Sequence, residues 1–176
     1  MTMDPYAQDR EKLVRILREI EASINEQSLD RMVDQMAPDA VVVWANAEVS
    51  RGPEEILAYY DRMVKGKDRI LTKYTTKAEL SGPARIYGDG TIAIAHGSMV
   101  DEFTPVIRGP FQLSSRWTTT VAKRDGEWKV VQLHLSANVF NNVLLDEAKK
   151  ALLTVGLGGL AAGAVIGVLV GKFLIP

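Results

Sequence analysis

The sequence has no cysteine and only two histidines. The absence of cysteine excludes disulfides, thiolate nucleophiles and cysteine-based metal sites, and two distant histidines do not form a zinc motif. An excess of one charge is also absent, because 21 Lys and Arg residues stand against 22 Asp and Glu residues. Nucleic-acid-binding domains carry a clustered basic surface. We therefore expect no metal, no cofactor and no nucleic-acid partner.

One long stretch has no charge at all. Residues 151–171 contain no Asp, Glu, Lys or Arg, and only Lys172 to Pro176 follow them. As a helix this run is roughly 31 Å long, close to the ~30 Å hydrocarbon core of a bilayer. We predict a transmembrane helix over 151–175, preceded by a helical stalk over 139–150. The alternative is an apolar tail that packs inside a soluble oligomer or stays disordered.

Glycine recurs every fourth residue within this stretch, at Gly159, Gly163, Gly167 and Gly171. On a helix this spacing puts the four glycines on one face, where two backbones can approach closely. We expect a homo-oligomer whose tails pack through this face. The competing explanation is that glycine is frequent in membrane helices in general.

The N-terminus lacks the apolar stretch of a secretory signal, because residues 1–10 are polar and then acidic. A domain that is not exported and is followed by a terminal span stays on the side where it is made. Lys149 and Lys150, just before the span, fit a cytoplasmic flank. The sequence therefore predicts a single-pass, tail-anchored membrane protein with its domain, residues 1–138, in the cytoplasm.

Within 1–138, helical periodicity comes first and strand periodicity follows. Apolar spacing predicts a helix of about twenty residues from Pro5, a short helix after Ser28 that Pro38 ends, and a helix from Gly52 to Gly66. Strands are expected over 40–47, 70–80, 85–87, 91–103, 111–123 and 128–137, with a hairpin turn at Asp125-Gly126. The predicted fold is α+β, a bent antiparallel sheet with three N-terminal helices on one face.

Strict alternation along the last strand divides its side chains between two faces. It puts the apolar set Val131, Leu133 and Leu135 towards a core. The other face then carries Trp128, Val130, Gln132, His134, Ser136 and Asn138. This mixed set suits a polar patch in a pocket or a dimer interface.

The closing hairpin resembles a known family. Arg116-Trp117-Thr118, followed by Arg-Asp-Gly-Glu-Trp-Lys-Val-Val-Gln-Leu-His-Leu-Ser over 124–136, is similar to the nuclear-transport-factor-2-like, or SnoaL-like, fold. Within it, the stretch is most similar to the ketosteroid-isomerase-related branch that includes the calcium/calmodulin-dependent kinase hub domain. The resemblance covers about residues 10–138 and implies a cone-shaped domain with a pocket between sheet and helices. The fold hosts isomerases, dehydratases, cyclases and non-enzymatic hubs, so it does not fix an activity.

The chain departs from the ketosteroid isomerases at the catalytic base. In those enzymes an Asp stands a few residues into the first strand, after an Asp-Ala pair. Here Asp39-Ala40 is followed by three valines and then Trp44, which occupies that place. Without a carboxylate there, proton abstraction next to a carbonyl has no base, and we expect no isomerase activity of that kind.

Three polar residues are candidate catalytic groups. His134 and His96 are general-base candidates because of the acid–base chemistry of the imidazole ring, and Arg116 is suited to an anionic ligand. Each has a structural alternative, namely a hydrogen-bonded or buried sheet histidine and an ion pair on the outer face. The expected pocket residues are Trp44, Tyr59, Tyr60, Trp117 and Ser136, which suit a small apolar or anionic ligand. Aromatic residues at such spacings are also typical of an ordinary core.

Two functions from different classes follow. The first is a tail-anchored homo-oligomer whose cytoplasmic domain is an assembly hub or small-ligand sensor, in one version around a helix-bundle pore. The alternative is a membrane-held SnoaL-like enzyme, of isomerase, dehydratase or cyclase type, that acts on a lipophilic small molecule. A soluble binding domain whose tail docks onto a membrane partner is a third option. The missing catalytic set favours the non-enzymatic prediction.

Overall fold

The structure is a computed structural model, and it describes residues 4–140 and 142–174, with side chains up to residue 156 and at 159 and 160. The chain divides into two compact units, Met1–Asn138 and Val139–Pro176. The first unit carries the helices and the sheet, and the second carries one long helix.

The helices of the first unit come early in the chain. They are α1 (Ala7–Asn25), α2 (Leu29–Val33) and α3 (Gly52–Tyr60), and the π-helical turn η1 (Asp61–Lys65) continues α3. Asp4 lies before α1, where its Oδ1 accepts the Tyr6 backbone N–H at 3.0 Å. The predicted second helix is too long at its C-terminal end, because Met36 already belongs to the first strand. That strand passes through Pro38, which therefore lies inside a strand and does not end a helix.

The strands form one seven-stranded sheet in the order β2-β1-β7-β6-β5-β3, with β4 paired to β5. Their bounds are β1 (Met36–Val43), β2 (Val49–Arg51), β3 (Leu71–Leu80), β4 (Arg85–Tyr87), β5 (Ile92–Pro105), β6 (Phe111–Arg124) and β7 (Glu127–Ala137). The α+β prediction is confirmed. The sheet is mixed rather than antiparallel, because β1 runs parallel to β7. No tight turn joins these two strands, so nothing forces them to be antiparallel.

A bulge interrupts the predicted alternation of β7. The core-facing position of Val131, Leu133 and Leu135 is confirmed, but Trp128 and Val130 belong to the core as well. Val121 pairs with Val130, whereas the preceding Thr120 pairs with Gln132, so Val131 is the extra residue. The strand therefore changes face at Val131. Trp128 and Val130 are buried before it, and Leu133 packs against the same core after it.

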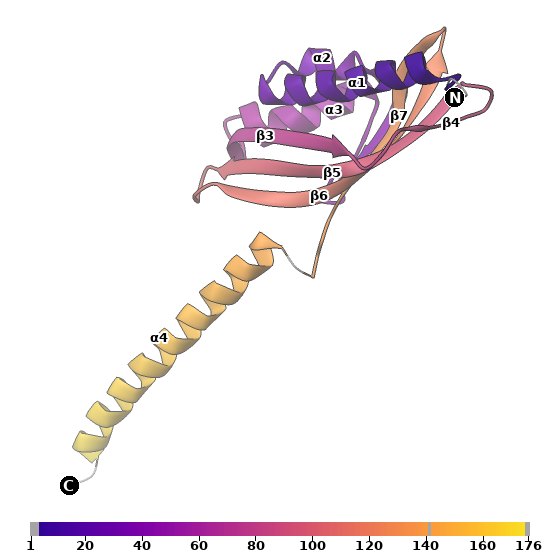
Figure 1. The fold of residues 1–176 in the computed structure, drawn as a ribbon. Helices are drawn as coiled ribbons and strands as arrows, with labels where there is room; N and C mark the ends of the chain where they lie inside the picture. The colour runs from indigo at the N-terminus through magenta and orange to yellow at the C-terminus, as the bar shows by residue number, and fades with distance from the viewer. Residues whose placement is uncertain (1–3, 141, 175–176) are drawn as a thin grey trace. The chain divides into compact units, whose positions relative to one another are not determined.

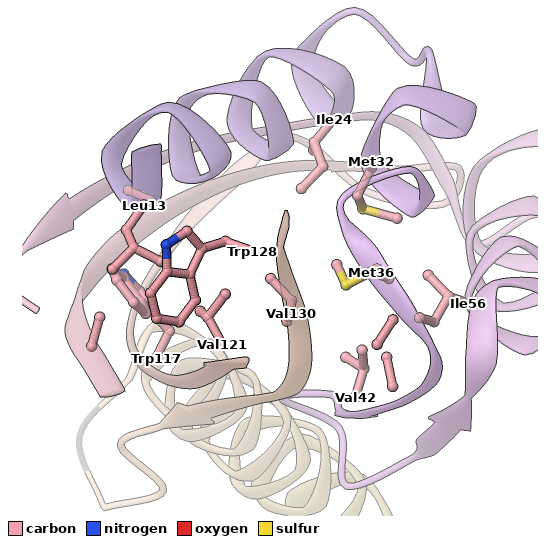
Figure 2. Close-up of a cluster of buried hydrophobic side chains, with 14 of the residues drawn as sticks. Leu13, Ile24, Met32, Met36, Val42, Ile56, Trp117, Val121, Trp128 and Val130 are labelled. Atoms are coloured by element: carbon pink, nitrogen blue, oxygen red, sulfur yellow. The ribbon is translucent and has the colours of Figure 1, made fainter. Parts of the chain in front are cut away.

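The three helices lie on one side of the sheet (Figure 1). Leu13 and Ile24 point from α1 towards the sheet residues Trp117, Val121 and Val130 (Figure 2). Met32, Met36, Val42 and Ile56 extend the same buried cluster towards α2, β1 and α3. The helices thus bury the inner face of the sheet, and the opposite face remains open to solvent within this unit.

The second unit contains α4 (Val143–Leu174). The predicted stalk begins too early, because Val139 and Phe140 lie before the helix. Asn142 Oδ1 accepts the Leu145 backbone N–H at 3.1 Å, which is the geometry of a helix N-cap.

The glycine stripe falls largely outside the described side chains. Among the described residues, no helix has both the length and the apolar character needed to cross a bilayer. Gly159 has open space around its Cα. Gly163, Gly167 and Gly171 lie in the part of α4 whose surroundings the structure does not describe.

Candidate functional site

A cavity of about 590 Å³ lies between α1 and the inner face of the sheet. Cavities of several hundred Å³ are the size that holds a drug-sized ligand. Its wall comes from α1, from Met32 of α2, from Tyr60 of α3 and from strands β1, β3, β5, β6 and β7. The first unit therefore encloses a ligand-sized space.

The cavity follows α1, which lines it from Arg10 to Ile24. Fifteen helical residues correspond to about 22 Å, so the space is elongated. Its exposed lining residues are Glu11, Val14 and Arg15 on α1 and Pro83 after β3, and they mark the rim. Arg10 Nε donates to the Ala84 carbonyl oxygen at 3.0 Å and ties α1 to this rim.

Small side chains on the sheet create the space. Ala78, Ala93 and Ala95 stand on the inner face and line the cavity, where larger residues would fill it. Gly97 leaves room for the indole ring of Trp117, because a Cβ there would lie 2.6 Å from Cζ2 of Trp117. The indole of Trp117 therefore lies across β5, and its Nε1 donates to the Ser98 carbonyl at 3.1 Å.

An aromatic group closes the cavity at the end of β1. Trp44 stacks on Tyr59 with ring centroids 4.1 Å apart and meets Tyr60 edge-on at 5.4 Å. The indole N–H of Trp44 donates to Ser50 Oγ at 2.9 Å, so only its apolar faces remain available. Burial raises the pKa of Tyr59 to about 12 and that of Tyr60 further, so both phenols stay neutral at physiological pH.

A buried carboxyl group lies behind this end. Asp101 is 2% exposed and accepts hydrogen bonds from Tyr74 Oη at 3.0 Å and from Ser115 Oγ at 3.5 Å. Burial raises the pKa of Asp101 to about 6, although hydrogen bonds with Thr76, Tyr74 and Ser115 lower it in part. In the described part of the chain no Lys, Arg or His forms an ion pair with it. Tyr74 lines the cavity and Asp101 does not.

The structure places the three predicted catalytic candidates outside this cavity. His96, Arg116 and His134 are exposed on the outer face of the sheet. His96 and His134 both pair with Thr118 of β6, one from each side. Arg116 Nη1 lies 3.4 Å from Ser81 Oγ. None of the three lines the cavity.

The predicted pocket residues divide between the two faces. Trp44, Tyr60 and Trp117 line the cavity, and Tyr59 packs behind Trp44. Ser136 is exposed and pairs with Arg116 on the outer face, because the bulge in β7 reverses the alternation. Within the residues that were described, no three His, Asp or Glu side chains gather as a metal site.

Asp101 and the cavity alanines are absent from the predicted site residues, although the alternation along β5 points to them. Asp101 shares the alternating face of Ala93, Ala95 and Met99, so it is a single carboxylate on an otherwise apolar strand face.

Comparisons with known proteins agree with this architecture. A family model described as a SnoaL-like domain matches residues 14–140. No curated protein matches the sequence. The type 2 hexachlorocyclohexane dehydrochlorinase LinA superposes with a TM-score of 0.68 at 14% identity, covering 77% of this chain and 89% of its own.

Two further solved structures are similar. A nuclear transport factor 2-like superfamily protein from Salmonella enterica serovar Typhimurium LT2 has a TM-score of 0.60 at 17% identity, covering 76% of this chain and 93% of its own. A candidate scytalone dehydratase from Novosphingobium aromaticivorans DSM 12444 has a TM-score of 0.61 at 14% identity, covering 75% and 85%. At such identities the likeness concerns the fold, and it confirms the predicted resemblance at that level.

Proposed function

This chain belongs to the SnoaL-like family, and we propose that it is a binding protein for an apolar small molecule held between α1 and the sheet. The observation that carries this proposal is the cavity of about 590 Å³ with its nearly unbroken apolar wall. A space of this kind favours a ligand because apolar surface left facing water is costly.

The indole and hydroxyl groups of four wall residues are already bonded within the protein. Trp44 and Trp117 use their indole N–H groups on Ser50 and on the Ser98 carbonyl. The Thr119 hydroxyl donates to the Gln132 carbonyl at 2.7 Å, and the Tyr74 hydroxyl donates to Asp101. What these residues offer a ligand is therefore apolar surface, and the gain on binding comes chiefly from burial.

The same wall argues against catalysis as the primary role. Its described carboxylates are Glu11, at the exposed rim, and Glu21, which accepts the Ala78 backbone N–H at 3.0 Å and pairs with Arg18 at 2.8 Å. Among the described residues that line the cavity there is no histidine. A general base within reach of a bound ligand is thus missing from the wall.

A titration with the neutral dye Nile red tests the proposal. The full-length protein should bind the dye saturably and shift its emission to the blue. Ala95→Phe fills the cavity and should abolish this binding. Thr118→Phe places the same ring on the outer face of β6 and should leave it intact. Equal binding by wild type and Ala95→Phe would refute an internal site.

An enzyme is the second candidate, and Asp101 is the observation that favours it. A buried carboxyl group with a pKa of about 6 stands next to the cavity-lining Tyr74, and such groups cluster at catalytic sites. The similar structures include proteins named as a dehydrochlorinase and a candidate dehydratase. Under this proposal Asp101→Asn abolishes turnover of a lipophilic substrate but leaves Nile red affinity unchanged.

We also propose that residues 151–175 hold the protein in a membrane, with the domain on the cytoplasmic side, and that it is a homo-oligomer. The support is the charge-free run over 151–171 and the stripe Gly159, Gly163, Gly167 and Gly171. An apolar ligand partitions into lipid, so anchoring would bring the cavity to its source. Carbonate-resistant membrane association tests the anchor. The double variant Gly163→Leu with Gly167→Leu tests the oligomer. It should give a smaller detergent-extracted particle than wild type.

A further inference from the structure

The turn between β5 and β6 carries exposed aliphatic side chains. Ile107 is 93% exposed, and Val106 beside it is 53% exposed. The segment that leads into β3 adds Ile70, which is 54% exposed. The two segments adjoin, because the Val106 backbone N–H donates to the Ile70 carbonyl oxygen at 3.0 Å. These three residues therefore form one apolar tip, whereas exposed apolar residues that stand singly are ordinary on protein surfaces.

Four exposed basic residues flank the apolar tip, namely Lys67, Arg69, Lys73 and Arg108. Asp68 is the one acidic residue within 67–73 and 104–111. Among the ion pairs of the described residues, none involves any of these four basic side chains. The guanidinium of Arg108 lies over the ring of Phe111, 4.1 Å from its centroid, and stays beside the tip. The positive charge around the tip is therefore available to a partner.

The apolar tip lies at the end of the sheet opposite β4 (Figure 1). It offers no groove, because almost nothing covers Ile107. A specific protein–protein interface needs about 800 Å² from each partner, which is more than three aliphatic side chains supply. A bilayer surface fits better. Aliphatic side chains enter the boundary between headgroups and acyl chains, and neighbouring Lys and Arg residues attract anionic headgroups.

We propose that the apolar tip binds the surface of a membrane that contains anionic lipid, with Ile107 at the boundary between headgroups and acyl chains and with Arg69 and Arg108 beside the headgroups. This contact belongs to the first unit, and it depends neither on the cavity nor on residues 151–175. Each basic residue at an anionic surface strengthens binding about fivefold. Salt weakens this attraction because counterions screen it.

The test uses the absence of cysteine from the chain, since a single introduced cysteine then carries the only label. Ile107→Cys, labelled with the fluorophore NBD, puts the probe on the tip of the full-length protein. The protein is reconstituted with phosphatidylcholine, with or without phosphatidylserine. The emission should shift to the blue only with phosphatidylserine, and lipids with a nitroxide on the acyl chain should quench it. High salt should reduce the shift.

Gly82→Cys is the matched probe position, because it lies in open space beyond the other end of β3. Its emission should not depend on the lipid. In the protein labelled at the tip, Arg69→Gln with Arg108→Gln should abolish the shift. Arg85→Gln with Arg124→Gln removes the same charge near the opposite end of the sheet and should leave the shift unchanged.

Several outcomes would overturn this inference without touching the cavity. One is a probe at position 107 that stays in water in both lipid mixtures, and another is an equal shift without phosphatidylserine. A shift that survives Arg69→Gln with Arg108→Gln, or that appears equally at position 82, would also contradict it. A blue-shifted probe that nitroxide lipids do not quench would show that the tip contacts protein, such as a second copy of the chain, in place of lipid.

Discussion

The Tyr74 hydroxyl donates a 3.0 Å hydrogen bond to Asp101 Oδ1 in the interior of the domain. The side chains of Thr76 and Ser115 are the further donors to this carboxyl group, and neutral donors offset only part of the cost of burying a charge. The interior of the domain beside the cavity is therefore sensitive to pH.

Asp101 should make the domain less stable as the pH rises from about 4 to about 6. Its pKa is about 6 in the folded state, above the ordinary value of 3.8, so in this window the unfolded chain releases a proton that the folded chain retains. Relative to Asp101→Asn, wild type should lose up to about 3 kcal/mol across the window. Urea unfolding of both proteins at several pH values measures the difference.

Tyr74→Phe provides the control for this prediction. It removes a donor that favours the ionised carboxylate, so the titration of Asp101 should move to higher pH. A stability difference between wild type and Asp101→Asn that does not vary with pH would contradict the assignment.

Asp9 should be a main attachment of α1 to the sheet. Its carboxylate accepts hydrogen bonds from Trp128 Nε1 and from Lys123 Nζ, both at 2.9 Å. These bonds lower the pKa of Asp9, so their contribution is present above about pH 4 and is lost as the pH falls below it. Asp9→Ala leaves the buried indole N–H unpaired and should cost about 1–3 kcal/mol in chemical unfolding.

Asp4→Ala is the comparison for Asp9, since Asp4 pairs with Arg10 near the same end of α1 but in solvent. Exposed ion pairs contribute little, so this variant should change stability much less. Equal losses in the two variants would contradict the special role of Asp9.

Gly97→Ala should destabilise the domain severely. The new Cβ would lie 1.9 Å from the Glu79 carbonyl oxygen of β3 and 2.6 Å from the Trp117 ring. Either the β3–β5 pairing or the indole must move, and overpacking of this kind costs about 1–3 kcal/mol or more. Gly82→Ala, in open space, should fall within about 0.5 kcal/mol of wild type by thermal unfolding. Similar melting temperatures for the two variants would count against the close packing at Gly97.

A chain that ends at Asn138 should fold and keep the cavity. All described lining residues lie between Arg10 and Leu135, and the first compact unit ends at Asn138. Circular dichroism and Nile red binding of the shortened protein check this. Loss of cooperative unfolding would show that the second unit is needed for the fold.

Much of the fold could be predicted because its signals are local. The Asp125-Gly126 turn fixes the β6–β7 hairpin, and the Gly52-Pro53 start of α3 depends on neighbouring residues alone. Local signals do not predict the parallel pairing of β1 with β7, because this pairing joins strands that are distant in sequence. Met36 was assigned to a helix because its spacing fits one, but tertiary pairing with Val130 makes it part of a strand.

The site was harder to predict than the fold, for one physical reason. An extra residue at Val131 reverses the face of every later side chain in β7. Leu133 and Leu135 line the cavity, as predicted for the core face. His134 and Ser136, which strict alternation puts on the face of Trp128 and Val130, point outwards while those two residues are buried. The aromatic residues Trp44, Tyr60 and Trp117 could be assigned to the pocket because none of them lies on β7, where the bulge occurs.

The most direct measurement is an organic extract of the purified full-length protein, analysed by mass spectrometry beside Ala95→Phe prepared in the same way. The account predicts a near-stoichiometric apolar compound in the wild-type extract, and its loss when Ala95→Phe fills the cavity. Extracts of the two proteins with the same content would contradict it.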